Sequence, residues 1–502
     1  MLRKLLLSFL VLMILGAVSL YWLGKPRQGE WISAYPLDRP LTFPEDFYFG
    51  TASAAQQVES QSPSDWTAFE QQALRDGMSG HGEEVGVALP GNIHGLDQAP
   101  AAAQRLKADY DRRYAEDFTL AREVLHNNAY RFSFEWSRLF PRADMTEPDP
   151  AAIAFYSGVL DELERQKITP FATLFHFSSP EWFWAERGGQ RGWERADAEQ
   201  HWQRYVAAVL KHFGPRVRHW ITLNEPMVYL NHGYREGIFP PLQQRHDVLD
   251  SMPVLVALAK AHAAAYQQIK QAAAAESGQP QTWVGIAQHT RAFEPWRNWN
   301  PLDRFAAAQI DQVFIWDFLD ALETGELKMS GSGFSEKIKG LAGTQDYVGL
   351  NYYGRFYVEI DLGRPLHPIM RGADPDIDKE VNDLGWAHHP KGFGDVLRQA
   401  YARYAKPIYV LENGTADARL DDRLRQSMLV SHMAEIAWAI EQGVPVQGYF
   451  HWSLTDNFEW AEGFLARFGL IAVDYANDFA RSPRKSAYLY GDIARTRAVR
   501  PQ

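Results

Sequence analysis

The most informative stretch of the sequence runs from Tyr130 to His176 and contains YRFSFEW (Tyr130–Trp136), AAIAFYSGVLDELERQ (Ala151–Gln166) and PFATLFH (Pro170–His176). The first and last of these segments are short runs rich in aromatic and apolar residues, as in a buried strand, whereas the middle one repeats apolar residues at helical spacing. Two parallel strands need a long crossover between them, and a helix is the usual one. The stretch therefore predicts a strand, a helix and a parallel strand.

The same alternation recurs eight times along the chain. Strands are expected near Phe47–Thr51, Tyr130–Trp136, Pro170–His176, Val217–Asn224, Trp283–Gln288, Tyr347–Tyr353, Ile408–Glu412 and Gln447–Trp452. Helices are expected at Tyr114–His126, Ala151–Gln166, Ala196–Phe213, Val254–Ala275, Asp303–Leu322, Asp395–Ala405, Asp421–Gln442 and Pro483–Arg495. Eight such units favour an α/β fold, a single (β/α)8 TIM barrel with long loops after its strands, over residues 43–495. A doubly wound open sheet shares the alternation, but the sequence has no glycine-rich phosphate-binding turn to support it. The segments after the first and fifth strands are expected to be loop insertions.

The first 27 residues differ from the rest. Leu5–Leu23 is a run of 19 uncharged, mostly apolar residues, flanked by Arg3, Lys4, Lys25 and Arg27. At about 1.5 Å per residue, a helix of this length just spans a hydrocarbon core of about 30 Å. This favours an uncleaved signal anchor (residues 1–27), a single transmembrane helix followed by a linker (residues 28–42). A cleaved signal peptide is the alternative. The flanking charges favour a cytoplasmic N-terminus, so we expect a membrane-anchored protein with an extracytoplasmic catalytic domain.

Composition excludes several classes of function. The 502 residues include no cysteine, which removes disulfide scaffolds, zinc–thiolate sites, iron–sulfur clusters and cysteine nucleophiles. The chain carries 51 Lys and Arg against 62 Asp and Glu, a net charge of −11. Because phosphate binding needs clustered basic residues, a nucleic-acid partner is not expected.

Polar side chains gather where the predicted strands end. They are Gln57, His176, Asn224, Glu225, Tyr353, Glu412, Asn413 and Trp452. Taken singly, each has a structural explanation, such as capping the next helix or filling a gap between loops. The carboxyl ends of parallel barrel strands meet on one face, however, and that face is where barrel enzymes keep their catalytic residues. The joint pattern therefore predicts an active site.

Two carboxylates on separate strands, Glu225 and Glu412, suggest glycoside hydrolysis. One carboxyl group protonates the leaving oxygen while the other attacks the sugar or activates water. Aromatic rings suit the apolar faces of sugars, and amides, imidazoles and carboxylates can hydrogen-bond to the hydroxyls. The spacing in the sequence leaves open whether the reaction retains or inverts the anomeric configuration.

Six ordered motifs resemble glycoside hydrolase family 1, which contains β-glucosidases and β-galactosidases. They are FGTASAAQQVE (Phe49–Glu59), YRFSFEW (Tyr130–Trp136), WITLNEP (Trp220–Pro226), GLNYYG (Gly349–Gly354), VLENG (Val410–Gly414) and HWSLTDNFEWAEGF (His451–Phe464). The resemblance runs from about Phe43 to about Tyr490. It implies one (β/α)8 barrel that hydrolyses terminal unphosphorylated β-D-glucosides or β-D-galactosides with retention, through a glycosyl-enzyme.

The resemblance also implies roles for individual residues. By motif, Glu225 matches the general acid/base and Glu412 the nucleophile. Arg131 and Tyr353 would contact Glu412, and the guanidinium would lower the pKa of this carboxyl, while Glu225 would stay protonated until the leaving group departs. Asn224 would hold the sugar 2-hydroxyl. The remaining substrate-binding residues would be Gln57, His176, Tyr353, Trp452, Glu459 and Trp460. No cofactor and no metal are expected.

Departures from the family pattern concern sugar preference. Phe177 and Ser178 follow His176 where the family usually has Trp-Asp, Gln56 replaces a common Tyr, and Leu411 replaces a common Thr. The pair Glu459 and Trp460 argues against the 6-phospho-glycosidase branch. A membrane anchor on this barrel is reminiscent of the plant branch that transfers galactosyl groups between galactolipids, so a transglycosylase acting on glycolipids is the alternative function. A non-catalytic carbohydrate-binding relative is disfavoured, because both glutamates are present.

Overall fold

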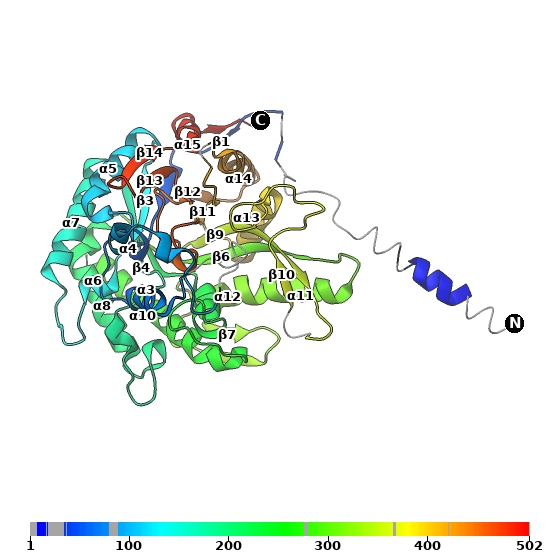
Figure 1. The fold of residues 1–502 in the computed structure, drawn as a ribbon, viewed down its shortest axis with the longest axis horizontal. Helices are drawn as coiled ribbons and strands as arrows, with labels where there is room; N and C mark the ends of the chain where they lie inside the picture. The colour runs from blue at the N-terminus through cyan, green and yellow to red at the C-terminus, as the bar shows by residue number, and fades with distance from the viewer. Residues whose placement is uncertain are drawn as a thin grey trace.

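The computed structural model describes residues 8–16, 18, 35–36, 38–79, 89–275, 280–364, 368–419 and 421–500. Within these residues, eight parallel strands close into a barrel (Figure 1). They are β2 (Tyr48–Ala52), β3 (Ala129–Ser133), β4 (Thr169–Phe175), β5 (His219–Asn224), β6 (Trp283–Pro295), β9 (Val348–Glu359), β11 (Ile408–Asn413) and β12 (Val446–Trp452). Pairing of β6 with β9 and of β12 with β2 completes the ring. The predicted TIM barrel is confirmed.

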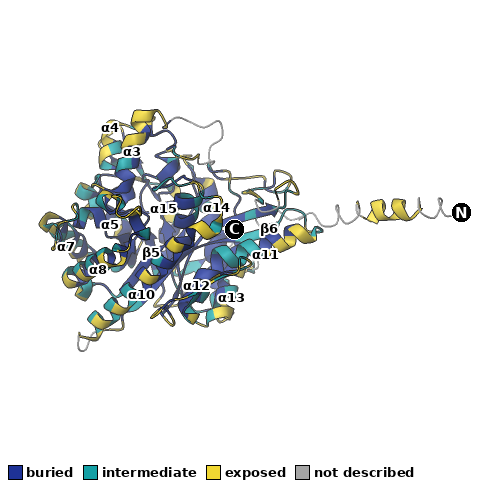
Figure 2. Ribbon diagram, turned by 90° about the horizontal axis from the view of Figure 1, so that it is seen from below, coloured by how far each residue is buried: buried dark blue, intermediate teal, exposed yellow. Residues whose placement is uncertain are grey.

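Helices cover the outside of the barrel, with at least one after every strand. They are α5 (Tyr110–Glu123), α7 (Pro150–Arg165), α8 (Ala198–Phe213), α10 (Met252–Ala274), α11 (Pro301–Asp311), α12 (Asp317–Thr324), α13 (Pro390–Tyr404), α14 (Arg423–Glu441) and α15 (Lys485–Thr496). Most of them turn a buried face toward the strands and an exposed face outward (Figure 2). The predicted helix over Asp303–Leu322 is interrupted by a π-helical turn, η7 (Gln312–Trp316), which separates α11 from α12.

Aromatic rings fill the end of the barrel where the strands begin. Phe171 of β4 stacks on the ring of His219 of β5, with ring centroids 4.1 Å apart, and Tyr48 of β2 and Tyr409 of β11 pack edge-on against Phe171. Burial lowers the pKa of His219 to about 3, so this ring is neutral and packs among the aromatic rings. The barrel is therefore a packed core at this end.

Smaller elements occupy the loops. The segment between β2 and β3 holds α2 (Ala55–Val58), α3 (Asp65–Asp76), α4 (Ala101–Leu106) and α5, and α6 (Trp136–Leu139) and α9 (Pro226–Leu230) follow β3 and β5. Short hairpins pair β7 (Glu326–Met329) with β8 (Phe334–Lys337) and β13 (Ile471–Asp474) with β14 (Ala480–Pro483). The strand β1 (Leu41–Thr42) pairs with β15 (Ala498–Val499) near the C-terminus.

The fifth strand of the barrel is longer than the sequence predicts. β6 continues to Pro295 and stays paired with β9 as far as Val358, and β10 (Ile369–Arg371) adds to the far edge of β9. These strands extend beyond the barrel on the right of Figure 1. The polar run Gln288–Arg291 suggests the end of a strand, yet its residues are buried and the Thr290 hydroxyl donates to the Asn351 carbonyl. Side chains alternate along the strand: His289 reaches Glu225, whereas Gln288 donates to the Phe314 carbonyl.

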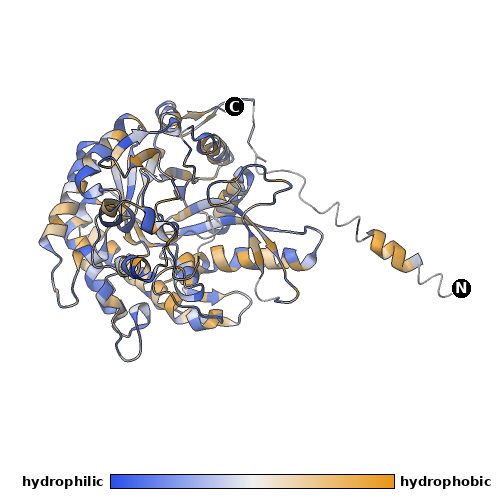
Figure 3. Ribbon diagram, in the orientation of Figure 1, coloured by the Kyte–Doolittle hydropathy of each residue, from blue (hydrophilic) through white to orange (hydrophobic). Residues whose placement is uncertain are grey.

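The predicted anchor falls mostly outside the described residues. Residues 8–16 form a helix whose large apolar side chains are exposed, and it stands apart from the barrel in Figure 3, coloured as hydrophobic. Among the described residues, one helix is long and apolar enough to cross a membrane, Val248–Ala274, but most of it is buried. It contains α10, which packs against α8 and β5, so it is a core helix of the barrel.

Candidate active site

The two candidate catalytic carboxyl groups lie at the ends of β5 and β11. Glu412 is the next-to-last residue of β11, and Glu225 directly follows β5. Glu225 has a left-handed backbone conformation (φ +45°), which is uncommon for a residue with a side chain, and Pro226 starts α9 immediately after it. This sharp junction between strand and helix turns the Glu225 side chain over the end of the barrel. Strained backbone of this kind occurs often at functional sites.

Glu412 is held by one hydrogen bond on each oxygen. Arg131 Nη1 of β3 donates to Oε1 over 2.6 Å, and the Tyr353 hydroxyl of β9 donates to Oε2 over 2.7 Å. Both partners are those expected from the sequence. Arg131 also donates to the Leu411 carbonyl and is fully buried, so it has one fixed position beside the carboxylate. A charge-assisted pair of this kind fixes both the orientation and the charge of the acceptor.

A chain of hydrogen bonds joins Glu412 to Glu225 across the barrel. Arg131 Nη2 donates to Asn224 Oδ1 over 2.7 Å, and Asn351 Nδ2 lies 3.2 Å from the same oxygen. Asn351 Nδ2 also donates to Glu225 Oε1 over 2.8 Å. The two carboxyl groups, which are nearly 190 residues apart in the sequence, are thus connected through side chains of β3, β5 and β9.

The pKa values of both carboxyl groups are shifted from that of an ordinary glutamate. Burial raises the pKa of Glu412 to about 7, against the opposing charge of Arg131, and the nearby charge of Glu225 adds to the rise. Burial would also raise the pKa of Glu225, but His289 and Asn351 outweigh it and hold this pKa below its usual value. Arg131 and Tyr353 lower the pKa of Glu412, as expected, but desolvation exceeds their effect. The lowered pKa of Glu225 differs from the expectation that this group stays protonated, because His289 and Asn351 stabilise its ionised form. Two buried carboxyl groups in one site share one proton near neutral pH, because like charges repel.

Most of the predicted substrate-binding residues form one group beside this pair. Gln57 Nε2 donates to Glu459 Oε2 (3.3 Å) and to the Phe458 carbonyl (2.8 Å), and Trp452 Nε1 donates to the same Glu459 oxygen (3.3 Å). The first strand's loop and the loop after β12 therefore meet at Glu459. Burial holds the pKa of His176 well below its usual value, so its ring is neutral.

The rings of His176, Trp452 and Trp460 form a stacked set. The His176 ring lies 5.8 Å from each indole, at interplanar angles of 24° and 23°. Trp460 also packs against Trp66 and Phe177, so it is part of the loop core as well as of the candidate site.

Several buried polar atoms of this group have no hydrogen-bond partner among the described residues. They are Gln57 Oε1, His176 Nδ1, Asn224 Nδ2 and Asn351 Oδ1. Buried polar groups are normally paired, and an unpaired one costs about 1–3 kcal/mol. Two acceptors, one amide donor and one ring nitrogen around a carboxylate pair match the hydroxyl groups of a sugar, each of which donates and accepts.

The residues that depart from the family pattern have structural partners. Phe177 packs on Tyr229, Phe239 and Trp460, with ring centroids 6.3, 5.5 and 5.4 Å away. The Ser178 hydroxyl donates to Glu135 Oε1 (3.1 Å). Gln56 is tied to Ser64 and Glu70, away from the carboxylate pair. An indole donor usual at position 177 is therefore replaced by a purely apolar ring.

Sequence reasoning missed three residues of the site. Asn351 and His289 both donate to or contact Glu225 Oε1, and Arg291 contacts His289. The fifth strand was expected to end at Gln288, so His289 and Arg291 fell in a predicted loop. The polar run QHTR (Gln288–Arg291) did not identify them, because it mixes His289 and Arg291, which lie toward Glu225, with Gln288, which donates to the Phe314 carbonyl.

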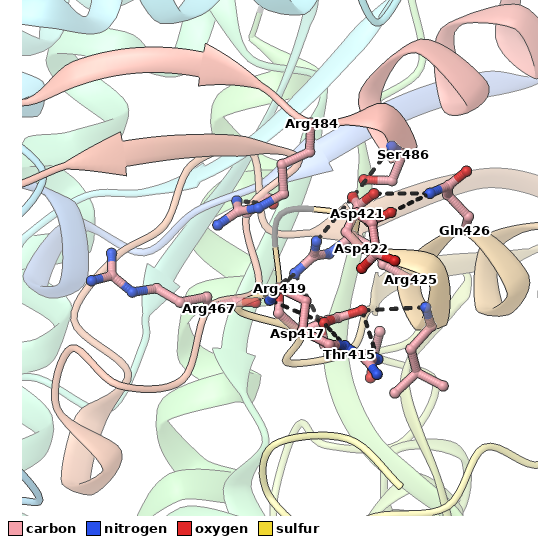
Figure 4. Close-up of polar contacts among 12 residues, drawn as sticks. Thr415, Asp417, Arg419, Asp421, Asp422, Arg425, Gln426, Arg467, Arg484 and Ser486 are labelled. Carbon is pink, nitrogen blue, oxygen red and sulfur yellow. Dashed lines mark hydrogen bonds and ion pairs between the residues drawn. The ribbon is translucent and has the colours of Figure 1, made fainter. Parts of the chain in front are cut away.

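A buried ionic network supports the loop that follows Glu412 and the loop that carries Glu459 (Figure 4). Arg425 of α14 donates to Asp422 Oδ2 (3.1 Å) and to the carbonyls of Asp417 (2.8 Å) and Arg467 (2.6 Å). Arg484 donates with two nitrogens to the two oxygens of Asp456 (3.0 and 2.9 Å), in the loop after β12. The network thus fixes the loop after β11 to the loop after β12. No group of His, Asp or Glu in the described part of the chain has the arrangement of a metal site.

Comparison with known proteins agrees with this geometry. Residues 39–499 match the model of glycosyl hydrolase family 1. The chain is 32% identical to beta-glucosidase 42 of Arabidopsis thaliana over 499 residues, which cover 91% of this chain and 94% of that protein. Among solved structures, it is similar to a beta-glycosidase from Pyrococcus horikoshii, with a TM-score of 0.77, 34% identity and coverage of 92% and 96% of the two chains. It is also similar to a beta-glucosidase from Thermotoga maritima in complex with deoxynojirimycin, with a TM-score of 0.75, 27% identity and coverage of 91% and 99%. The chain belongs to glycosyl hydrolase family 1.

Proposed function

We propose that this protein is a retaining β-glycosidase that hydrolyses terminal, unphosphorylated β-D-glucosides or β-D-galactosides. The observation that carries the proposal is the buried connection of Glu412, through Arg131, Asn224 and Asn351, to Glu225. Such a pair of carboxyl groups is the catalytic equipment of glycoside hydrolysis. Similarity to a beta-glucosidase and a beta-glycosidase over nine-tenths of the chain supports the substrate class.

In the first step, Glu412 attacks the anomeric carbon and forms a glycosyl-enzyme ester. Glu225 donates its proton to the glycosidic oxygen, so the aglycone leaves as a neutral alcohol. Arg131 and Tyr353 hold Glu412 in its attacking orientation, each through one oxygen. In the second step, Glu225 is a carboxylate and takes a proton from water, whose oxygen attacks the same carbon and releases Glu412. Two inversions give net retention.

The non-reducing-end sugar is proposed to bind between Gln57, His176, Asn224, Trp452, Glu459 and Trp460. Asn224 Nδ2 has no partner among the described residues, and it lies beside both carboxyl groups, where the sugar 2-hydroxyl must come. Burial raises the pKa of Glu459 to about 8, so its carboxyl group can hydrogen-bond to sugar hydroxyls but offers no cation to pair with a phosphate group. This supports unphosphorylated substrates.

The test is turnover of a panel of aryl β-glycosides, with product configuration followed by NMR. Glu412→Ala should abolish turnover without changing the fold. Glu225→Ala should reduce kcat/KM by far more for an alkyl or phenyl glucoside than for a dinitrophenyl glucoside, because a good leaving group needs little protonation. Full activity of the Glu412 variant, or equal losses on both substrates for the Glu225 variant, contradicts the assignments.

We also propose that Leu5–Leu23 anchors the protein in a membrane, with the barrel on the extracytoplasmic side. The uncharged length of this segment and the exposed apolar side chains of residues 8–16 support the proposal. Glycolipids would then lie within reach of the active site, and they belong in the substrate panel, with transglycosylation products measured beside hydrolysis. Intact mass of protein extracted from membranes is the test: a mature chain that starts near Leu20 contradicts the anchor.

A further inference from the structure

Glu225 has a second buried partner beside Asn351, His289 of β6. His289 Nδ1 lies 2.9 Å from Glu225 Oε1, and the imidazole is almost fully buried. The ring stacks on Tyr353, with centroids 5.7 Å apart and an interplanar angle of 17°, and its edge meets Phe314. The backbone N–H of Glu225 donates to the Ala287 carbonyl of the same strand β6 over 2.7 Å. Strand pairing and side-chain packing together fix His289 beside Glu225.

Arg291 determines which nitrogen of His289 carries the proton. Arg291 Nε lies 3.1 Å from His289 Nε2, two residues along the strand and on the same face. A guanidinium has only donors, so Nε2 must accept, and a ring whose Nε2 accepts carries its proton on Nδ1. Burial lowers the pKa of Arg291 to about 10, so the guanidinium stays protonated at neutral pH. His289 is therefore a neutral imidazole that donates from Nδ1 to Glu225.

The Arg291 side chain is itself held in place. Its Nη1 donates to the Tyr353 carbonyl over 2.9 Å, and the guanidinium lies 4.3 Å from the ring of Phe356 and 4.2 Å from that of Trp386. These contacts with two aromatic rings and one carbonyl group fix the position of the guanidinium. Arg291 is thus fixed by its own contacts, and it in turn orients His289 beside Glu225.

Both donors to Glu225 reach the same oxygen. His289 Nδ1 and Asn351 Nδ2 lie 2.9 and 2.8 Å from Oε1. An oxygen that accepts two hydrogen bonds is poorly placed to carry a proton, so the proton of the neutral acid belongs on Oε2. Donors to a carboxyl oxygen also stabilise its ionised form.

We propose that His289, fixed as an Nδ1–H donor by Arg291, is a positioning residue for Glu225: it places the transferable proton on Oε2 and favours the carboxylate. The inference rests on the proposed function of Glu225 as acid/base. In the first step the proton passes from Oε2 to the glycosidic oxygen. In the second step the carboxylate accepts a proton from water. His289 keeps its own proton throughout.

The other charged and titratable groups around Glu225 come from several elements. They are Arg131 of β3, Tyr353 of β9, Glu412 of β11 and Arg291 of β6, and His232 of η5 (Asn231–Arg235) acts on His289 through its charge. Burial, together with Arg291 and His232, keeps the pKa of His289 below its usual value, although the charge of Glu225 opposes this. His289→Leu and His289→Asn leave all these groups in place, so a change in the pH profile reports the donor at position 289.

The first experiment compares the pH profiles of His289→Leu and His289→Asn with that of the wild-type protein. Leu removes the donor, whereas the Asn side-chain amide can donate from the position of Nδ1. Without the donor, ionised Glu225 is less stable, so the alkaline limb of kcat/KM should move up by about one pH unit in His289→Leu. With a dinitrophenyl glycoside, kcat reports the second step, which needs ionised Glu225. This kcat should fall as the pH is lowered, and the loss should approach about tenfold at a pH below the pKa of Glu225 in both proteins. His289→Asn should retain both limbs of the wild type.

A higher alkaline limb of kcat/KM together with a lower kcat for the second step indicates a positioning role for His289, because a loss of packing would not shift the two in opposite directions. His219→Asn is the matched control, because it removes a buried histidine at the other end of the barrel; it should lower stability and leave both limbs unmoved. A His289→Leu profile that superimposes on the wild type overturns the proposal. So does a His289→Asn profile that shifts as much as that of the Leu variant.

The second experiment needs no turnover. In wild-type protein labelled with 15N-histidine, His289 should be neutral and protonated on Nδ1 at pH 7, and Arg291→Met should release this preference. A His289 ring protonated on Nε2, or on both nitrogens, overturns the proposal. If the wild type hydrolyses no aryl β-glycoside, the proposed function fails, and the state of the His289 ring still decides whether Arg291 fixes it.

Discussion

Replacing Tyr353 by Phe removes one hydrogen bond from Glu412 and little else. The hydroxyl donates to Oε2 over 2.7 Å inside the buried site, while Arg131 keeps its contact with Oε1. A hydrogen bond to a charged group contributes about 1.5–3 kcal/mol, and one pH unit corresponds to about 1.36 kcal/mol. The pKa of Glu412, which burial already raises to about 7, should therefore rise by a further one to two units, approximately.

The sign of the effect on activity follows from the role of Glu412. Attack requires the carboxylate, so a higher pKa removes the reactive form on the acidic side of the profile. We expect kcat/KM of Tyr353→Phe to fall by about 10- to 100-fold at pH 5. The loss should shrink as the pH rises, because the wild-type and variant carboxyl groups are then both ionised.

The neighbouring residue supplies the control. Tyr352 is adjacent in β9 and therefore faces the other side of the sheet, where its hydroxyl donates to the His389 carbonyl (2.8 Å) and its ring stacks on Phe393. Tyr352→Phe should lower stability by about 1 kcal/mol and leave the pH profile of kcat/KM in place. A Tyr353→Phe profile parallel to that of the wild type, or an equal shift in both variants, refutes the reasoning.

Three further predictions concern the sugar site and the loops around it. Asn224→Ala should lower kcat/KM for a glucoside at least about tenfold more than it lowers kcat/KM for the 2-deoxy analogue. Any structural damage from the substitution affects both substrates alike, so equal losses contradict a contact with the 2-hydroxyl. His176→Phe keeps a ring between Trp452 and Trp460 and removes its nitrogens, so thermal stability should hold while KM rises, and an unchanged KM argues against sugar binding by His176. Arg425→Met should lower the free energy of unfolding by about 3–5 kcal/mol in a denaturant titration, because Asp422 and two carbonyl groups lose a buried partner; a loss below about 1 kcal/mol means that the ionic network of Figure 4 does not hold the loops.

The barrel was predictable because its strands repeat one simple pattern. Runs such as FATLF are mostly apolar on both faces, as strands between a packed interior and a layer of helices must be, and a segment with helical spacing of apolar residues follows. The rule failed at β6, where Gln288–Arg291 are polar and buried. A strand that lines an active site breaks the apolar pattern because of that site, so its end cannot be recognised from polarity alone.

The carboxylate pair was predictable from position, and its electrostatics were not. Glu225 directly follows the buried strand β5, while Asn224, Glu412 and Tyr353 lie within the buried strands β5, β11 and β9. The pKa directions depend on how far desolvation exceeds the charge of Arg131, and on His289, a contact between different strands that no motif indicates. Such balances depend on distances and burial, which only the folded chain has.

The connection from Glu225 to Glu412 has a consequence for thermal behaviour. Its members sit on β3, β5, β9 and β11, so the barrel wall itself, rather than a movable loop, sets the spacing of the two carboxyl groups. Wall strands of a closed sheet open only with the whole barrel, whereas surface loops fluctuate at lower cost. Heating should therefore leave the catalytic pair intact until the barrel unfolds, and inactivation and loss of secondary structure should occur as a single transition.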